Sequence, residues 1–256
     1  QTQAFYTLSK RRPEFVKETL LKEVTKRLPD GYDVEKNFTP SYNPWDQRLC
    51  VVPNGDLFKA MRAGSAEVVT DTIDTFTKQG VLLNSGTELP ADIVVTATGL
   101  ELLFLGGIEL SVDGEQVDIG SKLTYKGMML EGVPNLGVAI GYTNASWTLK
   151  CELTCAYICR LLNRMHHDGY SQCTPKNSDG AMAPEPLLDL TSGYVQRSAG
   201  LLPKQGSRFP WKVYQSYVRD YPSLKFSKLN DGAMQFSGSK NFGETVSTPT
   251  KTGASR

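Results

Sequence analysis

Apolar and polar residues recur with a helical period near the start of the chain. Apolar residues return every four positions from Val16 to Leu28, which is the spacing of an amphipathic helix. Pro13 suits the first turn of this helix, and the stretch Pro-Asp-Gly at 29–31 ends it. A shorter helix is predicted at 56–63, where Gly64 ends the pattern.

The middle of the chain reads as short strands. Apolar, β-branched runs occur at 66–76, 80–85 and 91–99, and the turn at 84–86 separates the last two. Asp113-Gly114 lies between two alternating stretches, which predicts a two-residue hairpin. Short strands are thus expected between the predicted helices.

A near-continuous apolar run at 135–141 precedes the strongest predicted helix, at 148–165. Such a run is typical of a central strand that is covered on both faces. The helix ends with His166 and His167, which favour a helix C-terminus, and Gly169 stops it. Beyond residue 170 the pattern weakens, and the Ser/Thr/Gly/Lys-rich stretch 237–256 predicts a disordered tail.

The junction between this predicted strand and helix has the composition of a ligand site. A strand that leads into a helix N-terminus points backbone N–H groups and a positive dipole at whatever lies above the strand end. Gly141 would admit a ligand closely, and Thr143, Asn144 and Ser146 would add donors and cap the helix. The pattern favours an anionic or dipolar ligand, with an ordinary capped turn as the alternative.

Two further stretches carry weaker signals. The apolar run at 91–99 ends in the small residues Thr-Ala-Thr-Gly at 96–99, as at a crossing between domains. The irregular loop 37–53 holds three prolines, aromatic residues, and Arg48 close to Asp46. A long loop with bulky and charged residues is often functional, and a structural contact between Asp46 and Arg48 is the alternative.

Composition excludes several classes of function. Hydrophobic residues make up 39% and charged residues 21%, and 28 basic against 27 acidic residues give a net charge of +1. This balance gives no case for nucleic acid or an anionic membrane surface as partner. The longest apolar run, 93–108, is interrupted by Glu101 and glycines, and it is shorter than the ~20 residues that span a bilayer. Five cysteines without framework spacing predict reduced thiols and a cytoplasmic setting.

Three cysteines at 151, 155 and 159 share one face of the predicted helix. No C-x-x-C pair accompanies them, and cysteines four positions apart on a helix have the wrong geometry for a disulfide. We therefore expect no metal site here, and we interpret these cysteines as small buried apolar residues.

Several motifs together resemble a known family. They are "YNPWDQRLCVVPNGDLF", "PADIVVTATGL", "YKGMMLEGVPNLGVAIG", "GYTNASWTLK" and "LPKQGSR", in this order. The chain from about 32 to 217 is similar to the flavin-containing monooxygenase superfamily, and within it to the Baeyer–Villiger monooxygenases, close to a mycobacterial subgroup.

The resemblance implies FAD and NADPH as cofactors, with O2 and a small organic substrate. In such enzymes NADPH reduces the flavin, and a peroxyflavin then oxygenates a ketone or a heteroatom. The implied fold class is α/β: an incomplete two-dinucleotide-binding-domain (Rossmann-like) flavoprotein with a short helical insertion and an irregular C-terminal tail. Residues 1–36 would be the remnant of a helical insertion, 37–95 the end of the NADP-binding domain, 96–236 the end of the FAD-binding domain, and 237–256 the tail.

The resemblance also assigns site residues. Arg48 matches the active-site arginine, a permanent cation beside the flavin. Gln47 stands where many members have lysine, which weakens the expected contact with the NADPH 2′-phosphate. The crossing contributes Thr98 and Gly99, and Trp147 could shape the substrate pocket or pack in the core. The turn under the flavin would consist of Gly141, Tyr142, Thr143, Asn144, Ala145 and Ser146.

No G-x-G-x-x-G fingerprint occurs in the sequence, although both dinucleotide-binding domains need one. We therefore expect the chain to be the C-terminal half of such an enzyme, to need the N-terminal half, and to be inactive alone. A flavin disulfide reductase shares the two-domain plan, but no C-x-x-C redox pair is present. A non-catalytic fragment that acts as an interaction module is the alternative from another class.

Overall fold

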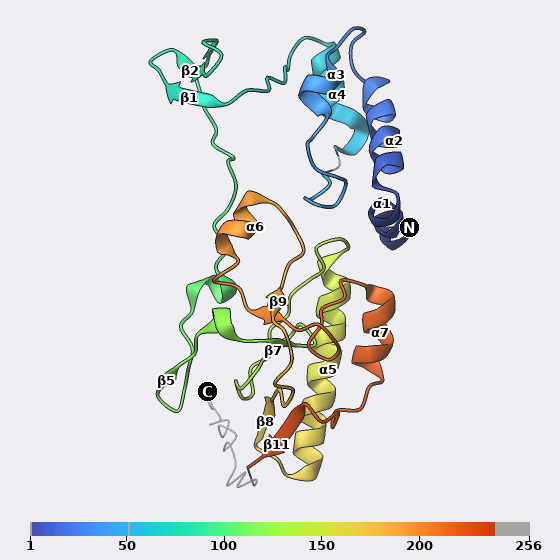
Figure 1. The fold of residues 1–256 in the computed structure, drawn as a ribbon, viewed down its shortest axis with the longest axis vertical. Helices are drawn as coiled ribbons and strands as arrows, with labels where there is room; N and C mark the ends of the chain where they lie inside the picture. Colours follow the sequence, from blue (N-terminus) through green and yellow to red (C-terminus); the bar gives the residue numbers. More distant parts are fainter. Residues whose placement is uncertain (1, 51, 239–256) are drawn as a thin grey trace, which may run out of the picture. The chain divides into compact units, whose positions relative to one another are not determined.

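The computed structural model describes residues 2–50 and 52–238, which fall into two compact units (Figure 1). Unit 1 contains the described residues up to Leu103, together with Thr143–Ala145 and Leu188–Leu201. Unit 2 contains Phe104–Tyr142, Ser146–Leu187 and the described residues from Leu202 onward. Most of the predicted disordered tail at 237–256 lies outside the described residues, and Ser237 instead ends strand β11.

Unit 1 begins with helices. The apolar stripe predicted from Val16 is confirmed on α2, where Val16 is buried and Leu20 and Val24 are half-buried, but the helix ends at Thr25, so the buried Leu28 lies beyond it. The predicted short helix is confirmed as α4, and Gly64 follows its end with a φ of +70°. The helical elements of this unit are α1 (Thr2–Arg11), α2 (Pro13–Thr25), α3 (Val34–Phe38), η1 (Pro53–Gly55), α4 (Asp56–Arg62) and α6 (Gly193–Ser198).

A three-stranded antiparallel sheet follows in unit 1, in the order β1 (Ile73–Phe76), β2 (Gly80–Leu83) and β3 (Glu88–Pro90). The predicted turn at 84–86 is confirmed, because the N–H of Gly86 donates to the carbonyl of Leu83 at 2.9 Å. The prediction of a strand at 91–99 is wrong, because β3 ends at Pro90, just before this segment. Residues 91–100 are all exposed and form no strand, because the described chain supplies no neighbouring strand to cover them.

Unit 2 is built around the long helix α5 (Trp147–Asp168), which packs along α7 (Tyr217–Lys225) (Figure 1). Gly169 ends α5 in the left-handed conformation, with a φ of +81°, as predicted. The core consists of buried residues around Tyr157 of this helix, among them Leu123, Tyr125, Met129, Leu153, Leu161, Trp211 and Leu224.

Paired short strands complete unit 2. The predicted hairpin is confirmed: β4 (Ser111–Val112) and β5 (Glu115–Gln116) flank Asp113 and Gly114, and both turn residues have positive φ. The other antiparallel pairs are β6 (Thr124–Tyr125) with β7 (Met129–Leu130), β8 (Gln172–Pro175) with β11 (Met234–Ser237), and β9 (Glu185–Pro186) with β10 (Lys204–Gln205). Short helical turns lie at η2 (Phe104–Gly107) and η3 (Ile119–Ser121).

The central strand predicted at 135–141 is wrong. This segment forms no strand, and its residues alternate between half-buried and exposed before Gly141. A strand covered on both faces needs neighbours on both edges, and the strand pairs of the described residues do not include this segment. All the sheets in the described part of the chain are antiparallel, so the parallel sheet of a Rossmann-like domain is not formed within it.

The interpretation of the helical cysteines is also wrong. Cys155 and Cys159 are exposed and Cys151 is half-buried. The buried stripe of α5 lies on the neighbouring face, at Lys150, Leu153, Thr154, Tyr157, Leu161 and Met165. The cysteines face away because that stripe packs against the rest of unit 2.

Candidate cofactor-binding site

The N-cap residue of α5 does not cap the helix with its side chain. Ser146 is its N-cap residue but makes no side-chain capping hydrogen bond, so the prediction that Ser146 caps the helix is wrong. Its hydroxyl oxygen lies 2.8 Å from Oγ1 of Thr148 instead. No acidic residue occupies the first turn. Neither the Ser146 side chain nor an acidic side chain of the first turn therefore offsets the positive end of this 22-residue helix.

Gly141 must be a glycine because of Trp147. A Cβ atom at position 141 would overlap the Trp147 indole and would lie 2.6 Å from the Trp147 Cα atom. The close approach predicted at Gly141 is thus made by the chain's own tryptophan. The side chain of Trp147 is 55% exposed, so it is not a core tryptophan. The roles of Gly141 and Trp147 toward a cofactor or a substrate stay predictions.

Tyr142 and Lys150 anchor this turn to α7. The Tyr142 hydroxyl donates to Oδ2 of Asp220 at 2.8 Å, and Nζ of Lys150 lies 2.8 Å from the same oxygen. Burial raises the pKa of Tyr142, and the Asp220 carboxylate adds to this rise. The buried carboxylate therefore fixes the residue that follows Gly141 and the first turns of α5. Asp220 was not predicted from the sequence, because 70 residues separate it from Lys150.

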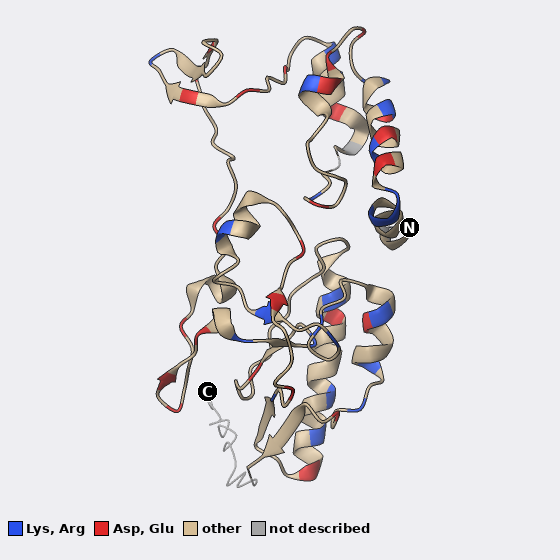
Figure 2. Cartoon of the chain, viewed as in Figure 1, with Lys and Arg blue, Asp and Glu red and all other residues tan. Residues whose placement is uncertain are grey.

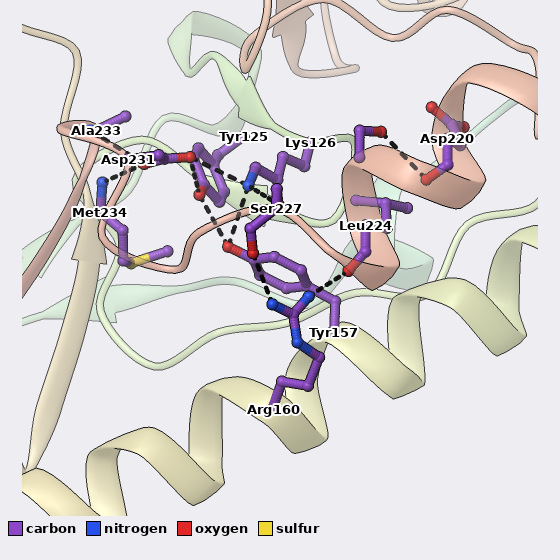
Figure 3. Close-up of polar contacts among 11 residues, drawn as sticks. Tyr125, Lys126, Tyr157, Arg160, Asp220, Leu224, Ser227, Asp231, Ala233 and Met234 are labelled. Atoms are coloured by element: carbon purple, nitrogen blue, oxygen red, sulfur yellow. Dashed lines mark hydrogen bonds and ion pairs between the residues drawn. The ribbon is translucent and has the colours of Figure 1, made fainter.

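A second buried polar cluster surrounds Lys126 (Figure 3). Its Nζ lies 3.1 Å from Oδ2 of Asp231 and 3.1 Å from Oγ of Ser227, and the same carboxylate accepts the Tyr125 hydroxyl at 2.7 Å. Burial lowers the pKa of Lys126, while Asp231 opposes this change. Burial also raises the pKa of Tyr157, which lies beside this lysine, to about 12.

Arg160 closes this cluster from α5. Its two terminal nitrogens donate to the carbonyls of Leu224 at 2.7 Å and Ser227 at 2.6 Å, as Figure 3 shows. These carbonyls lie at the end of α7 and just beyond it, where cations are favourable. Because its polar groups are paired with one another, we assign the cluster to the packing of α5, α7 and β11 rather than to chemistry.

Arg48 lies in unit 1, in a loop that the N-terminal helices hold. Nζ of Lys10 pairs with Oδ1 of Asp46 at 3.0 Å, and the rings of Tyr6 and Trp45 meet edge to face at 5.5 Å. The alternative contact between Asp46 and Arg48 is therefore wrong. Arg48 is exposed, and within the described residues its guanidinium forms no ion pair.

The remaining predicted site residues lie in three places. Gln47 is half-buried in the Arg48 loop, where it bridges to Pro44. Thr98 and Gly99 are exposed in the extended segment of unit 1, and Gly99 has a φ of +115°. Thr143, Asn144 and Ala145 belong to unit 1, and Tyr142, Ser146 and Trp147 belong to unit 2.

Charge and metal-binding groups add little to this picture. Acidic and basic residues are interspersed along α2 (Figure 2), in keeping with the small net charge of +1. Among the described residues, no three or more His, Cys, Asp or Glu side chains are grouped to hold a metal ion. In the same residues, no helix combines the length and the apolar character needed to cross a membrane.

The described residues form a mixture of helices and strands, which is consistent with an α/β flavoprotein fold, and a protein crystallised with FAD is similar in structure. The crystal structure of OTEMO in an FAD-bound form superposes with a TM-score of 0.53 at 19% identity, over 67% of this chain and 33% of that one. No protein-family model matches the chain.

The curated relatives are more specific. The chain is 50% identical over 233 residues to the FAD-containing monooxygenase EthA of Mycobacterium tuberculosis. The aligned residues make up 91% of this chain and 48% of EthA. It is 49% identical over 232 residues to the probable FAD-binding monooxygenase AlmA of Acinetobacter baylyi, over 90% of this chain and 46% of AlmA. The chain is thus a relative of the FAD-containing monooxygenases, as its motifs predicted, and it spans about half their length.

Proposed function

We propose that this chain is part of an FAD- and NADPH-dependent monooxygenase of the Baeyer–Villiger type. The substrate would be a small organic molecule, and a ketone, sulfur or nitrogen centre is compatible with the proposal. The carrying observation is 50% identity over 233 residues to an FAD-containing monooxygenase. The lack of a Ser146 cap at the start of α5 and the exposed position of Arg48 support it.

The residues at the start of α5 fit a flavin. Its first turn lacks both a side-chain cap and an acidic residue, so its N–H groups and dipole would favour the negative charge of a reduced ring. Tyr142 is held by Asp220, so the adjoining backbone is preorganised before a cofactor binds. When bound, FAD would supply the activation of O2 with electrons from NADPH.

Arg48 would supply a permanent positive charge to the same chemistry. Arg48 is exposed, and Lys10 rather than Arg48 pairs with the nearby Asp46. A fixed cation stabilises negative charge that develops on oxygen, and it can position the nicotinamide cofactor. Gln47 carries no charge for a 2′-phosphate, so we expect a less strict preference for NADPH over NADH.

The proposal requires the other half of the enzyme. Thr98, Gly99 and residues 141–146 would meet the cofactor in the complete protein, and we propose a cytoplasmic setting for it. The proposed cofactor domains, 37–95 for NADP and 96–236 for FAD, stay predictions. A flavin disulfide reductase is the second candidate, and an interaction module without catalysis is the third.

The test is to fuse this chain to the half of M. tuberculosis EthA that it does not match. NADPH-dependent oxygen uptake with oxygenated product supports a monooxygenase. Disulfide reduction without oxygen uptake would indicate the reductase, and neither activity in a flavin-loaded fusion would indicate the interaction module. Arg48→Ala should lower the rate of product formation about 10²–10³-fold, whereas the matched control Arg62→Ala on α4, also exposed, should leave the rate unchanged.

A further inference from the structure

Unit 1 contains most of the predicted cofactor-binding residues. They come from three distant stretches of the sequence, at 47–48, 98–99 and 143–145. The segment 188–201, which includes the short helix α6, belongs to the same unit. No residue of this segment was predicted from the sequence to bind a cofactor, yet its hydrogen bonds connect it to two of the three stretches.

Thr191 ties the beginning of this segment to the loop that carries Arg48. The N–H of Thr191 donates to the carbonyl of Asp46 at 2.8 Å, and the Thr191 hydroxyl donates to the same oxygen at 3.1 Å. Lys10 holds the Asp46 carboxylate from the other side, at 3.0 Å. The backbone two residues before Arg48 is therefore fixed to the segment that leads into α6.

The end of α6 is tied to the predicted crossing. The hydroxyl of the buried Ser198 accepts the N–H of Leu102 at 3.0 Å. Nη2 of Arg197 lies 3.5 Å from the carbonyl oxygen of Leu100, and it would lie 3.4 Å from a Cβ atom at Gly99. The Arg197 guanidinium is therefore held directly beside Gly99.

The positive charge of Arg197 is not compensated within unit 1. Arg197 is exposed, and within the described residues its guanidinium forms no ion pair. The 3.5 Å contact with Leu100 is longer than an ordinary hydrogen bond. A guanidinium has five N–H donors in a planar fork that matches a phosphate group, and Gly99 presents no side chain to it.

We propose that Arg197 is a further cofactor-binding residue and that it binds a phosphate group of a dinucleotide beside the crossing. The proposal rests on the proposed function, which supplies NADPH and FAD as the dinucleotides. The 2′-phosphate of NADPH and the pyrophosphates of both molecules offer a guanidinium the same chemistry, so three probes are needed to tell them apart. Thr191 and Ser198 are positioning residues, because they fix the segment 191–198 between the Arg48 loop and the crossing.

Binding measurements test this contact without turnover. The protein is the fusion of this chain to the unmatched half of M. tuberculosis EthA, and equilibrium dialysis with NADP+, NAD+ and, after removal of the flavin, FAD gives three dissociation constants. Arg197→Ala should raise at least one of them about tenfold or more, because it removes charge-assisted hydrogen bonds to the phosphate. A loss for NADP+ alone identifies the 2′-phosphate, an equal loss for NADP+ and NAD+ identifies their pyrophosphate, and a loss for FAD identifies the flavin pyrophosphate.

Two further variants make the result specific to the guanidinium. Arg197→Lys keeps the charge but lacks the planar fork, so it should lose less affinity than Arg197→Ala. Arg62→Ala is the matched control, because Arg62 is also an exposed arginine in the last turn of a short helix of unit 1, and it should change none of the three constants. The effect of Arg197→Ala should also shrink as the salt concentration rises, since salt screens exposed charges. Thermal unfolding of each variant verifies that its fold is intact.

The proposal is overturned if Arg197→Ala leaves all three dissociation constants unchanged, if Arg62→Ala raises them equally, or if the wild-type fusion binds none of the three probes. Should Arg197→Ala fail to fold, the same criteria apply to Arg197→Lys. Weaker binding by the variant together with a wild-type fusion that takes up no oxygen would contradict the proposed function and leave the phosphate contact intact. Oxygen uptake with unchanged dissociation constants would contradict the phosphate contact alone.

Discussion

Lys150 of α5 and Asp220 of α7 form an ion pair of 2.8 Å inside unit 2, with side chains that are 5% and 9% exposed. Removal of one partner leaves the other charge buried without compensation, which costs about 3–5 kcal/mol. We expect Asp220→Asn to lower the free energy of unfolding by about this amount, measured by urea denaturation.

The matched control for this substitution is Asp56→Asn. Asp56 pairs with Lys59 at 3.1 Å, but both side chains are more than 60% exposed, and such pairs contribute less than about 1 kcal/mol. The double variant Lys150→Met/Asp220→Asn should recover much of the stability, because it leaves no buried charge and the amide oxygen at position 220 can still accept the Tyr142 hydroxyl. Equal losses for Asp220→Asn and Asp56→Asn would contradict the prediction.

The second buried pair predicts a dependence of stability on pH. Although burial opposes it, the Tyr125 hydrogen bond and the Lys126 charge hold the pKa of Asp231 below its usual value of 3.8. A depressed carboxyl pKa stabilises the fold above the unfolded-state pKa, and this contribution disappears as the pH falls through the folded-state pKa. We expect the advantage of wild type over Asp231→Asn to be constant above about pH 5 and to shrink as the pH falls below about 4.

Urea denaturation of both proteins at a series of pH values measures this difference. Asp179→Asn serves as a second carboxyl variant from the same unit, since Asp179 pairs with an exposed arginine, Arg208. A gap between wild type and Asp231→Asn that does not change between pH 7 and pH 2 would show that the carboxylate charge adds no stability.

Gly141 allows a test of the turn before α5. Gly141→Ala would drive a methyl group into the Trp147 indole and against its Cα atom at 2.6 Å, and overpacking of this kind costs about 1–3 kcal/mol. We expect a lower midpoint of thermal unfolding and a shifted tryptophan fluorescence spectrum. Gly180→Ala is the control, because nothing lies within 4 Å of a Cβ atom there; it should leave both measurements almost unchanged.

The cofactor prediction concerns the chain alone. The sequence contains no G-x-G-x-x-G fingerprint, and the backbone N–H groups of that motif bind the pyrophosphate of a dinucleotide. We expect the isolated 256-residue chain to retain little or no FAD after gel filtration, whereas its fusion to the unmatched half of EthA should be yellow. A stoichiometric flavin spectrum from the chain alone would refute this expectation.

The sequence predicted those elements whose signals are local. The stripe of α2, the Gly169 stop of α5 and the Asp113-Gly114 turn depend on residues within a few positions of each other, and all three are present. The apolar runs at 91–99 and 135–141 predicted strands that are absent. Apolar composition indicates that a segment is to be covered, but the covering neighbours are distant in sequence.

The same distinction holds for the candidate site. The unusual composition of the loop around Arg48 and the small residues before α5 could be recognised in the sequence. The carboxylates of Asp220 and Asp231 could not be recognised, because their partners are distant in the sequence. Asp220 lies 70 residues from Lys150, and Asp231 lies 106 residues from Tyr125. The cysteines were predicted to be buried for a related reason. The buried face of α5 contains the charged Lys150, and its pairing with Asp220 could not be recognised in the sequence.

The exposed segment 91–100 has a practical consequence for handling the protein. Ile93 and Val95 are each 83% exposed, in a β-branched stretch that forms no strand. An exposed apolar segment of high β-propensity can pair with the same segment of other molecules and so cause aggregation. Preparations of the chain should therefore precipitate at a lower concentration than those in which Val95 is replaced by a charged residue, so this exposed segment, and not the net charge, would limit the solubility.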